Sequence, residues 1–189
     1  MGAGAAHIGP ARQNDAMRVG IYDHFGWAIA VTATADGNVI DRRRIELVEP
    51  GLTQAPVHYD ASSLDDTVLT ARITEVRASV NRCADAAFAD LDDAVPGIGS
   101  ISLRAWPADF PTDLATIRRA PYESRADAVM YRQELARVAE QRGWRVWQYD
   151  AKAVLTKVTE DVLTAPRERL GPPWTKDHRV ALAAAISSG

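Results

Sequence analysis

The order of hydrophobic patterns along this 189-residue chain predicts an α/β domain built on a mixed five-stranded sheet. Three runs with a two-residue period come first, and the turn signal between the second and third is typical of an antiparallel meander. Two more strand-like runs then alternate with long helical patterns, and such crossovers make the strands that they join parallel. We therefore expect one sheet flanked by helices.

The first three strands are predicted over residues 18–23, 27–34 and 38–48. In the first of them, RVGIYD, the residues Val19, Ile21 and Asp23 share a face, because side chains alternate along a strand. The dipeptide Asp36-Gly37 stands between the second and third runs, and both residues accept the positive φ of a tight hairpin turn. These three strands form the predicted meander.

Helices are predicted where apolar residues recur at steps of three and four. Over residues 64–95 this stripe consists of Leu69, Ile73, Val76, Val80, Cys83, Ala87 and Leu91. Pro96-Gly97 ends this helix. The remaining predicted elements are a strand over 98–105, a helix over 123–142, a strand over 144–149, and helices over 152–163 and 175–186. The proline-containing segments 49–63 and 106–124 are expected to be loops, and loops as long as the second are usually functional or mobile.

Composition narrows the classes of function. The chain carries 22 Lys and Arg against 25 Asp and Glu, a net charge of -3, which argues against a uniformly basic surface but leaves local basic patches open. No apolar run approaches the roughly 20 residues that span a bilayer. A single cysteine excludes an internal disulfide, so a cytoplasmic protein without a membrane segment is expected. Residues 1–16 are expected to be a disordered leader and residues 17–189 a single domain.

Three segments carry a family resemblance. The segments are VGIYDHFGWAIAVTATADGNVI, RQELARVAEQRGWRVWQYDAKAV and KDHRVALAAAI. They resemble the opening strands, the later helix and strand, and the closing helix of the crossover-junction resolvase and YqgF-like branch of the RNase H-like fold. Four shorter segments, IYDHFGW, LRAWP, YESRADAVMYR and GPPWTKDHR, also resemble an uncharacterised family of small actinobacterial-type proteins, which implies no activity.

The resolvase resemblance implies a divalent-metal-dependent nuclease that acts on structured or single-stranded nucleic acid. Two Mg²⁺ or Mn²⁺ ions, roughly 3.5–4 Å apart, would be held by carboxylates. Asp23 and Asp177 are the implied catalytic metal ligands, and Glu123 or Asp109 would complete the site. Tyr22 stands where the resolvase pattern has its aspartate, so in a regular strand Asp23 turns to the other face. The fourth strand ends in Leu103-Arg104-Ala105, where the resemblance would have a carboxylate.

Other interpretations of the same residues stay open. Asp23 before His24-Phe25-Gly26 is also typical of a turn residue, and Asp177 near a helix start also stabilises the helix dipole. Basic side chains that would form a phosphate-binding rim if their elements converge are Arg118, Arg119, Arg125, Lys176 and Arg179. The alternative function is a catalytically degenerate RNase H-like module that binds nucleic acid or a protein partner. A homodimer is a further expectation for an enzyme of this fold.

Overall fold

The computed structural model describes residues 16–187, and its five strands form one sheet in the order β3-β2-β1-β4-β5. The strands are β1 (Met17–Asp23), β2 (Trp27–Ala33), β3 (Val39–Glu46), β4 (Ile98–Arg104) and β5 (Arg145–Tyr149). β1 pairs antiparallel with β2, and β2 antiparallel with β3, whereas β4 is parallel to both β1 and β5. The predicted mixed five-stranded sheet is therefore confirmed. The predicted leader, 1–16, lies almost wholly outside the described residues.

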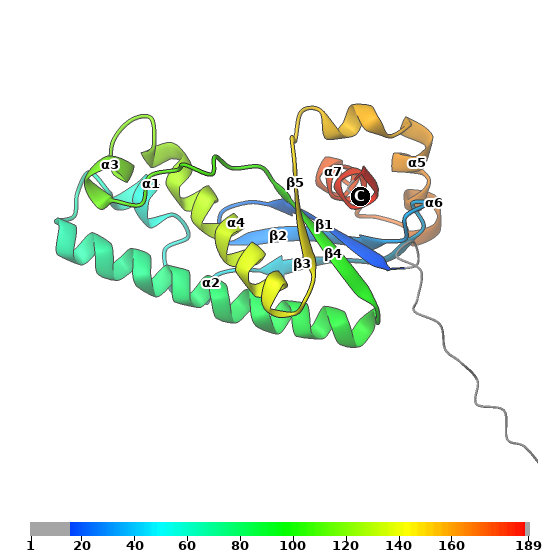
Figure 1. Cartoon of the computed structure of the whole chain (residues 1–189), viewed down its shortest axis with the longest axis horizontal. Helices are drawn as coiled ribbons and strands as arrows, with labels where there is room; N and C mark the ends of the chain where they lie inside the picture. The colour runs from blue at the N-terminus through cyan, green and yellow to red at the C-terminus, as the bar shows by residue number, and fades with distance from the viewer. Residues whose placement is uncertain (1–15, 188–189) are drawn as a thin grey trace, which may run out of the picture.

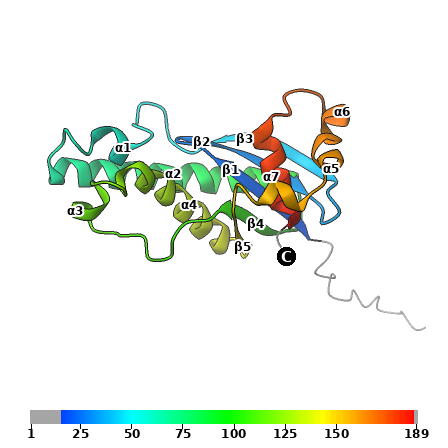
Figure 2. The same ribbon diagram turned by 90° about the horizontal axis from the view of Figure 1, so that it is seen from above.

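Helices cover both faces of the sheet (Figures 1 and 2). On one face lie the long helix α2 (Asp66–Ala94) and α4 (Glu123–Gln141), and on the other lies α7 (Lys176–Ser187). The predicted stripe of α2 is largely correct, because Leu69, Val76, Val80 and Leu91 are buried, while Cys83 is only half-buried. Asp65 caps α2 by accepting hydrogen bonds from the backbone N–H groups of Thr67 and Val68 in the first turn.

β1 is regular along its pairing with β2, and this regularity decides which way each side chain faces. Val19 and Ile21 pack into the core under α2 and α4, while Tyr22 packs with the core under α7. At Gly20, a Cβ atom would lie 1.8 Å from the backbone oxygen of Ala181 in α7. The absence of a side chain at this position therefore allows α7 to lie directly on the strand.

Three sequence-based assignments were wrong in detail. The loop predicted over 49–63 contains the short helix α1 (Pro56–Asp60), and the long loop over 106–124 contains α3 (Leu114–Ile117). In place of one helix over 152–163, the chain forms a 3-10 turn η1 (Val154–Lys157), then α5 (Glu160–Thr164) and α6 (Pro166–Leu170). The extended backbone of Val158 separates η1 from α5, and Pro166 begins α6 because its fixed φ suits a first helical turn.

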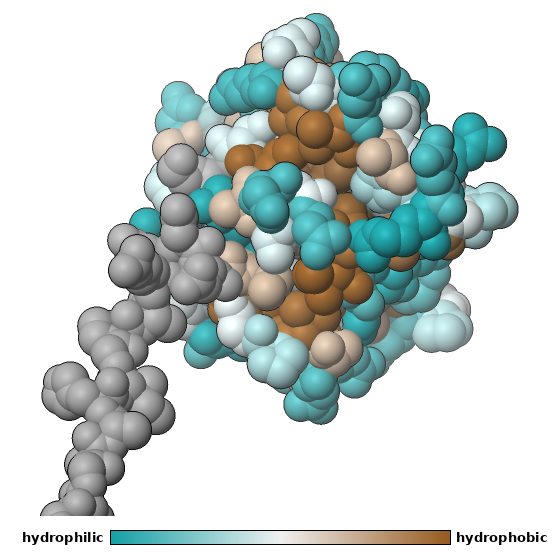
Figure 3. All heavy atoms as spheres, turned by 90° about the vertical axis from the view of Figure 1, so that its right-hand side faces the viewer, coloured by the Kyte–Doolittle hydropathy of each residue, from teal (hydrophilic) through white to brown (hydrophobic). Residues whose placement is uncertain are grey.

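Different helices form the two ends of the molecule. The end that carries α5 and α6 shows apolar side chains in the middle of its surface, with polar ones around and between them (Figure 3). The opposite end is formed by α1, α3 and the first turns of α2 and α4 (Figure 1). Within residues 16–187, no helix combines the length and the apolar character needed to cross a bilayer.

Candidate functional site

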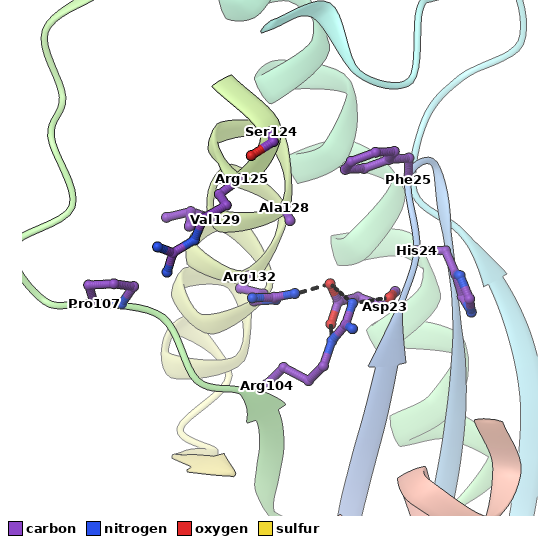
Figure 4. Close-up of a pocket in the computed structure, with 10 residues that line it drawn as sticks. All are labelled: Asp23, His24, Phe25, Arg104, Pro107, Ser124, Arg125, Ala128, Val129 and Arg132. Atoms are coloured by element: carbon purple, nitrogen blue, oxygen red, sulfur yellow. Dashed lines mark hydrogen bonds and ion pairs between the residues drawn. The ribbon is translucent and has the colours of Figure 1, made fainter. Parts of the chain in front are cut away.

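The site lies where the carboxyl ends of the neighbouring parallel strands β1 and β4 meet. Asp23 is the last residue of β1 and Arg104 the last residue of β4. Asp23 continues the alternation of Val19 and Ile21, so its side chain faces α4, which contributes Arg132. Two strand ends and one helix thus bring a carboxylate and two guanidinium groups together (Figure 4).

Asp23 is the buried centre of this group, with only 2% of its surface exposed. Nε and Nη2 of Arg104 donate to the two carboxylate oxygens at 2.8 Å each, and Nη2 also donates to the Asp23 backbone carbonyl. Nε of Arg132 donates to Oδ2 at 3.0 Å. A buried carboxylate is costly unless it is paired, and these bonds provide the compensating charge. Asp23 is therefore neither a turn residue nor a free ligand.

The two arginines are themselves held in place. Burial opposes the charge on Arg104, but the hydrogen bonds to Asp23 and the electrostatic attraction of that carboxylate, Tyr149 and Tyr22 together outweigh it and hold the Arg104 pKa above its usual value. The guanidinium of Arg104 also lies over the Tyr22 ring, 4.7 Å from its centroid. Nη1 of Arg132 donates to the backbone oxygen of Ala105 at 3.3 Å. Both groups therefore stay fully charged with fixed orientation.

These side chains line a pocket of about 420 Å³. Its remaining walls come from the loop after β1, the loop after β4 and the first turns of α4, namely His24, Phe25, Pro107, Ser124, Arg125, Ala128 and Val129. The formal charge of the lining is three guanidinium groups against the single carboxylate of Asp23. A concave surface with excess positive charge attracts anions.

Several N–H donors in this pocket have no acceptor among residues 16–187. Asp23 and nearby carbonyls engage Nε and Nη2 of Arg104 and Nε and Nη1 of Arg132, but within this described part of the chain no hydrogen bond is made by Arg104 Nη1 or Arg132 Nη2. Neither nitrogen is a buried atom without a partner, so both are open to solvent. The side chain of Arg125 makes no hydrogen bond within the described chain, and its guanidinium carbon lies 5.9 Å from the Phe110 ring centroid. These donors can bind an oxyanion without breaking existing contacts.

Asp177 lies on the other face of the sheet. It is in the first turn of α7, and its Oδ2 atom is 3.0 Å from Nε2 of His24. The His24 ring stacks on Trp27, with centroids 4.0 Å apart, and meets the edge of Tyr22. Tyr22 and Trp27 both belong to the core under α7. The carboxylates of Asp23 and Asp177, predicted to be joint metal ligands, therefore face opposite sides of β1.

The donor set around Asp23 does not fit a divalent cation. Both carboxylate oxygens accept bonds from guanidinium groups, where a two-metal site needs further oxygen ligands. Asp109 is exposed in the turn after β4, and Glu123 is the first residue of α4, with Oε2 buried and unpartnered. Among residues 16–187, no three His, Cys, Asp or Glu side chains are grouped so as to hold a metal ion. The predicted Mg²⁺ or Mn²⁺ ligand set is not assembled.

The predicted basic rim is divided in the same way. Arg118 is engaged by Asp66 and by the carbonyls of Ala61 and Leu64, and Arg179 pairs with Glu160 at 2.8 Å. Arg119 and Lys176 are exposed, but Arg119 follows α3 whereas Lys176 begins α7, and these helices lie far apart in Figure 1. Of the five predicted rim residues, Arg125 is the one that lines the pocket.

The fold has a solved counterpart. The chain is similar to T. thermophilus RuvC, solved in complex with Holliday junction substrate, with a TM-score of 0.53, 12% sequence identity and 92% of each chain covered. The present chain therefore has an RNase H-like fold. At 12% identity the similarity establishes the architecture of the RNase H-like domain and nothing finer. No protein-family model and no curated protein matches the sequence, so the resemblance to small actinobacterial-type proteins stays a prediction, as does the homodimer.

Two functional residues of this RNase H-like domain had only weak signals in the sequence. Arg104 was visible as a basic residue at a strand end where a carboxylate was expected, and its pairing with Asp23 follows once β1 and β4 are neighbours. Arg132 lies seven residues after Arg125, two helical turns along α4. The spacing places both on the same side of the helix, but only tertiary packing brings that side to Asp23.

Proposed function

We propose that this RNase H-like protein binds nucleic acid through the pocket at the carboxyl ends of β1 and β4, and that it holds the phosphate backbone without hydrolysing it by a two-metal mechanism. The observation that carries the proposal is the pairing of Asp23 with Arg104 and Arg132. It converts the edge of the sheet where the resemblance implies a cation site into a site for anions.

The chemistry of the pocket supports a phosphate ligand. Arginine binds phosphate oxygens with paired N–H donors, and the open nitrogens of Arg104, Arg125 and Arg132 supply such donors in one cavity. The structurally similar RuvC was solved with a Holliday junction, so four-way junctions belong among the nucleic acids to be tested. With a net charge of -3, the whole chain does not attract polyanions indiscriminately, and local positive charge must do so.

The first experiment is a fluorescence-anisotropy titration of single-stranded DNA, duplex DNA and a four-way junction at several salt concentrations. The informative variant is Arg125→Gln, because Arg125 is exposed and its side chain makes no hydrogen bond in the described chain. Arg145→Gln is a matched control. Arg145 is also exposed, lies 5.7 Å from the centroid of the Trp147 ring, and begins β5 at the end of the strands that is opposite to the pocket.

We expect the logarithm of the association constant to fall linearly with the logarithm of the salt concentration. Arg125→Gln should weaken binding and reduce the slope by about 0.7–0.9, the value for one lost phosphate contact. Arg145→Gln should change neither quantity. Equal effects of the two variants, or no binding of any nucleic acid, would refute the proposed site.

The same substrates are incubated with Mg²⁺ or Mn²⁺ to test for cleavage. We expect no cleavage above the background of the Asp23→Asn variant. Metal-dependent cleavage by the natural sequence that disappears in Asp23→Asn would contradict the proposal and restore the nuclease interpretation of Asp23.

A further inference from the structure

The pocket has two chemically different parts. Its floor is formed by Asp23, Arg104 and Arg132, whereas its sides include the apolar groups of Phe25, Pro107, Ala128 and Val129. In Figure 4, Phe25 and Pro107 stand on opposite sides, and Asp23 and Arg132 lie between them. A site for backbone phosphate alone needs only donors at the surface. The apolar sides therefore call for a ligand that is more than an anion.

Phe25 is fixed at the side of this cavity by the loop that carries it. His24 N–H donates to the Trp27 carbonyl at 2.8 Å, and Leu47 N–H donates to the Gly26 carbonyl at 2.8 Å, so the loop is tied to β2 and to the residue after β3. Gly26 has a φ of 81°, a conformation that glycine adopts without strain. The ring of Phe25 packs partly against the core. Its position is thus set before any ligand enters.

The volume of the cavity suits a small organic ligand that carries an anionic group. About 420 Å³ lies within the range of roughly 300–1,000 Å³ that is usual for sites of small organic ligands. A nucleotide combines a flat aromatic base with an anionic phosphate, which are the two features that an aromatic side and an arginine floor recognise. A base within a duplex is stacked on its neighbours and cannot enter such a cavity.

We infer that the pocket accepts one unpaired nucleotide of a nucleic-acid strand, with its base against Phe25 and its phosphate on Arg104, Arg125 and Arg132. This inference rests on the proposed function and names its substrate class. Nucleic acids that contain an unpaired or easily extruded base, at a bulge, a flap or a junction, are the preferred ligands. Perfect duplex binds through the arginines alone.

The test compares three DNA duplexes that differ at one position: a perfect duplex, a duplex with a one-nucleotide bulge, and a duplex with an abasic bulge. The abasic bulge keeps the distorted backbone and removes only the base. Stacking of one base on an aromatic side chain corresponds to roughly a tenfold gain in affinity, so the base bulge should bind about tenfold more tightly than the abasic bulge. With 2-aminopurine as the bulged base, binding should also change its fluorescence.

Two variants assign that gain to the pocket. Phe25→Leu keeps an apolar side chain but removes the aromatic face, and it should bring the ratio of affinities for base and abasic bulges close to one. Ala128→Met fills the cavity from α4 and should have the same effect. Ala128 is only half-buried, so this second variant keeps the test valid if Phe25→Leu folds poorly by circular dichroism. In both variants the readout is the ratio of affinities for base and abasic bulges, so a change in affinity that is common to all three duplexes does not enter it.

The outcomes separate the inference from the proposed function. Equal affinity for base and abasic bulges, together with salt-dependent binding of the perfect duplex, would overturn the nucleotide pocket and leave the phosphate site standing. A preference for the base bulge that persists in both Phe25→Leu and Ala128→Met would place the base elsewhere and also overturn it. Absence of binding to all three duplexes would refute the inference and the proposed function together.

Discussion

Replacing Asp23 with asparagine should lower the free energy of unfolding by about 2–4 kcal/mol, because the substitution leaves two guanidinium groups without their counter-charge. Asp23 is 2% exposed and accepts three bonds from side-chain nitrogens at 2.8–3.0 Å. The estimate lies below the largest values for buried pairs because the side chains of Arg104 and Arg132 are 24% and 13% exposed, so water partly replaces the lost partner. An amide at position 23 also turns an N–H group toward another donor.

The sign of this change distinguishes a structural ion pair from a metal ligand. In a cluster of carboxylates without metal, replacing one by an amide relieves repulsion and raises stability. The measurement is urea unfolding in EDTA, followed by tryptophan fluorescence, because Trp144 is buried in the core. Asp109→Asn, the same change at an exposed aspartate, should leave stability within about 0.5 kcal/mol. Unchanged or raised stability of Asp23→Asn would refute the assignment of Asp23 as the centre of the ion pair.

Three further changes test other parts of the fold. Burial raises the pKa of Asp127 to about 6, although its carboxylate accepts hydrogen bonds from two backbone N–H groups of α1. The contribution of Asp127 to stability should therefore be complete below its ordinary pKa of 3.8 and be lost as the pH rises through 6. Carbon NMR of the carboxyl should give that pKa, and Asp127→Asn should remove the pH dependence of stability. Gly20→Ala should cost about 3 kcal/mol or more in urea unfolding, because its Cβ would meet the Ala181 oxygen at 1.8 Å; a loss below 1 kcal/mol would contradict the close packing of α7 on β1. Arg42→Gln should make 170–173 more sensitive to proteolysis, since Arg42 donates to all four of its backbone carbonyls, and equal cleavage rates would show that these bonds do not hold the segment.

The sequence pattern predicted the elements whose conformation depends on neighbouring residues, and it missed an element that depends on a distant contact. The hairpin turn follows from Asp36-Gly37, and Gly37 has a positive φ of 90°, but Asp36 does not share the positive φ that was expected of both residues. The helix α1 was missed because its N-terminus is capped by Asp127, which is distant in sequence and accepts the N–H groups of Val57 and His58 at 3.1 and 2.8 Å. A contact of this kind leaves no trace in the periodicity of 49–63.

The candidate site was predicted in the same partial way. Alternation along β1 predicted that Asp23 would turn away from the face of Tyr22, and the regular register with β2 confirms it. What Asp23 meets on its own face depends on α4 and on the end of β4, which the sequence orders along the chain but does not pair side chain to side chain. The resemblance to resolvases supplied a ligand set that joins Asp23 to Asp177, whereas the structure places the two carboxylates on opposite faces of β1.

The charges at this edge of the sheet depend on one another, so a single substitution would not rebuild a two-metal site. A carboxylate as deeply buried as Asp23 needs counter-charge, and Arg104 with Arg132 supplies it. Exchanging Arg104 for glutamate would set a second carboxylate beside Asp23 with only Arg132 left to compensate, while Asp177 in α7 would still lie on the opposite face of the sheet. Because β1 is regular, bringing a carboxylate to the face of Asp177 requires a change at Tyr22 and not at Asp23. Strand alternation and charge compensation therefore link these positions, and together they support the proposed anion site at this edge of the sheet.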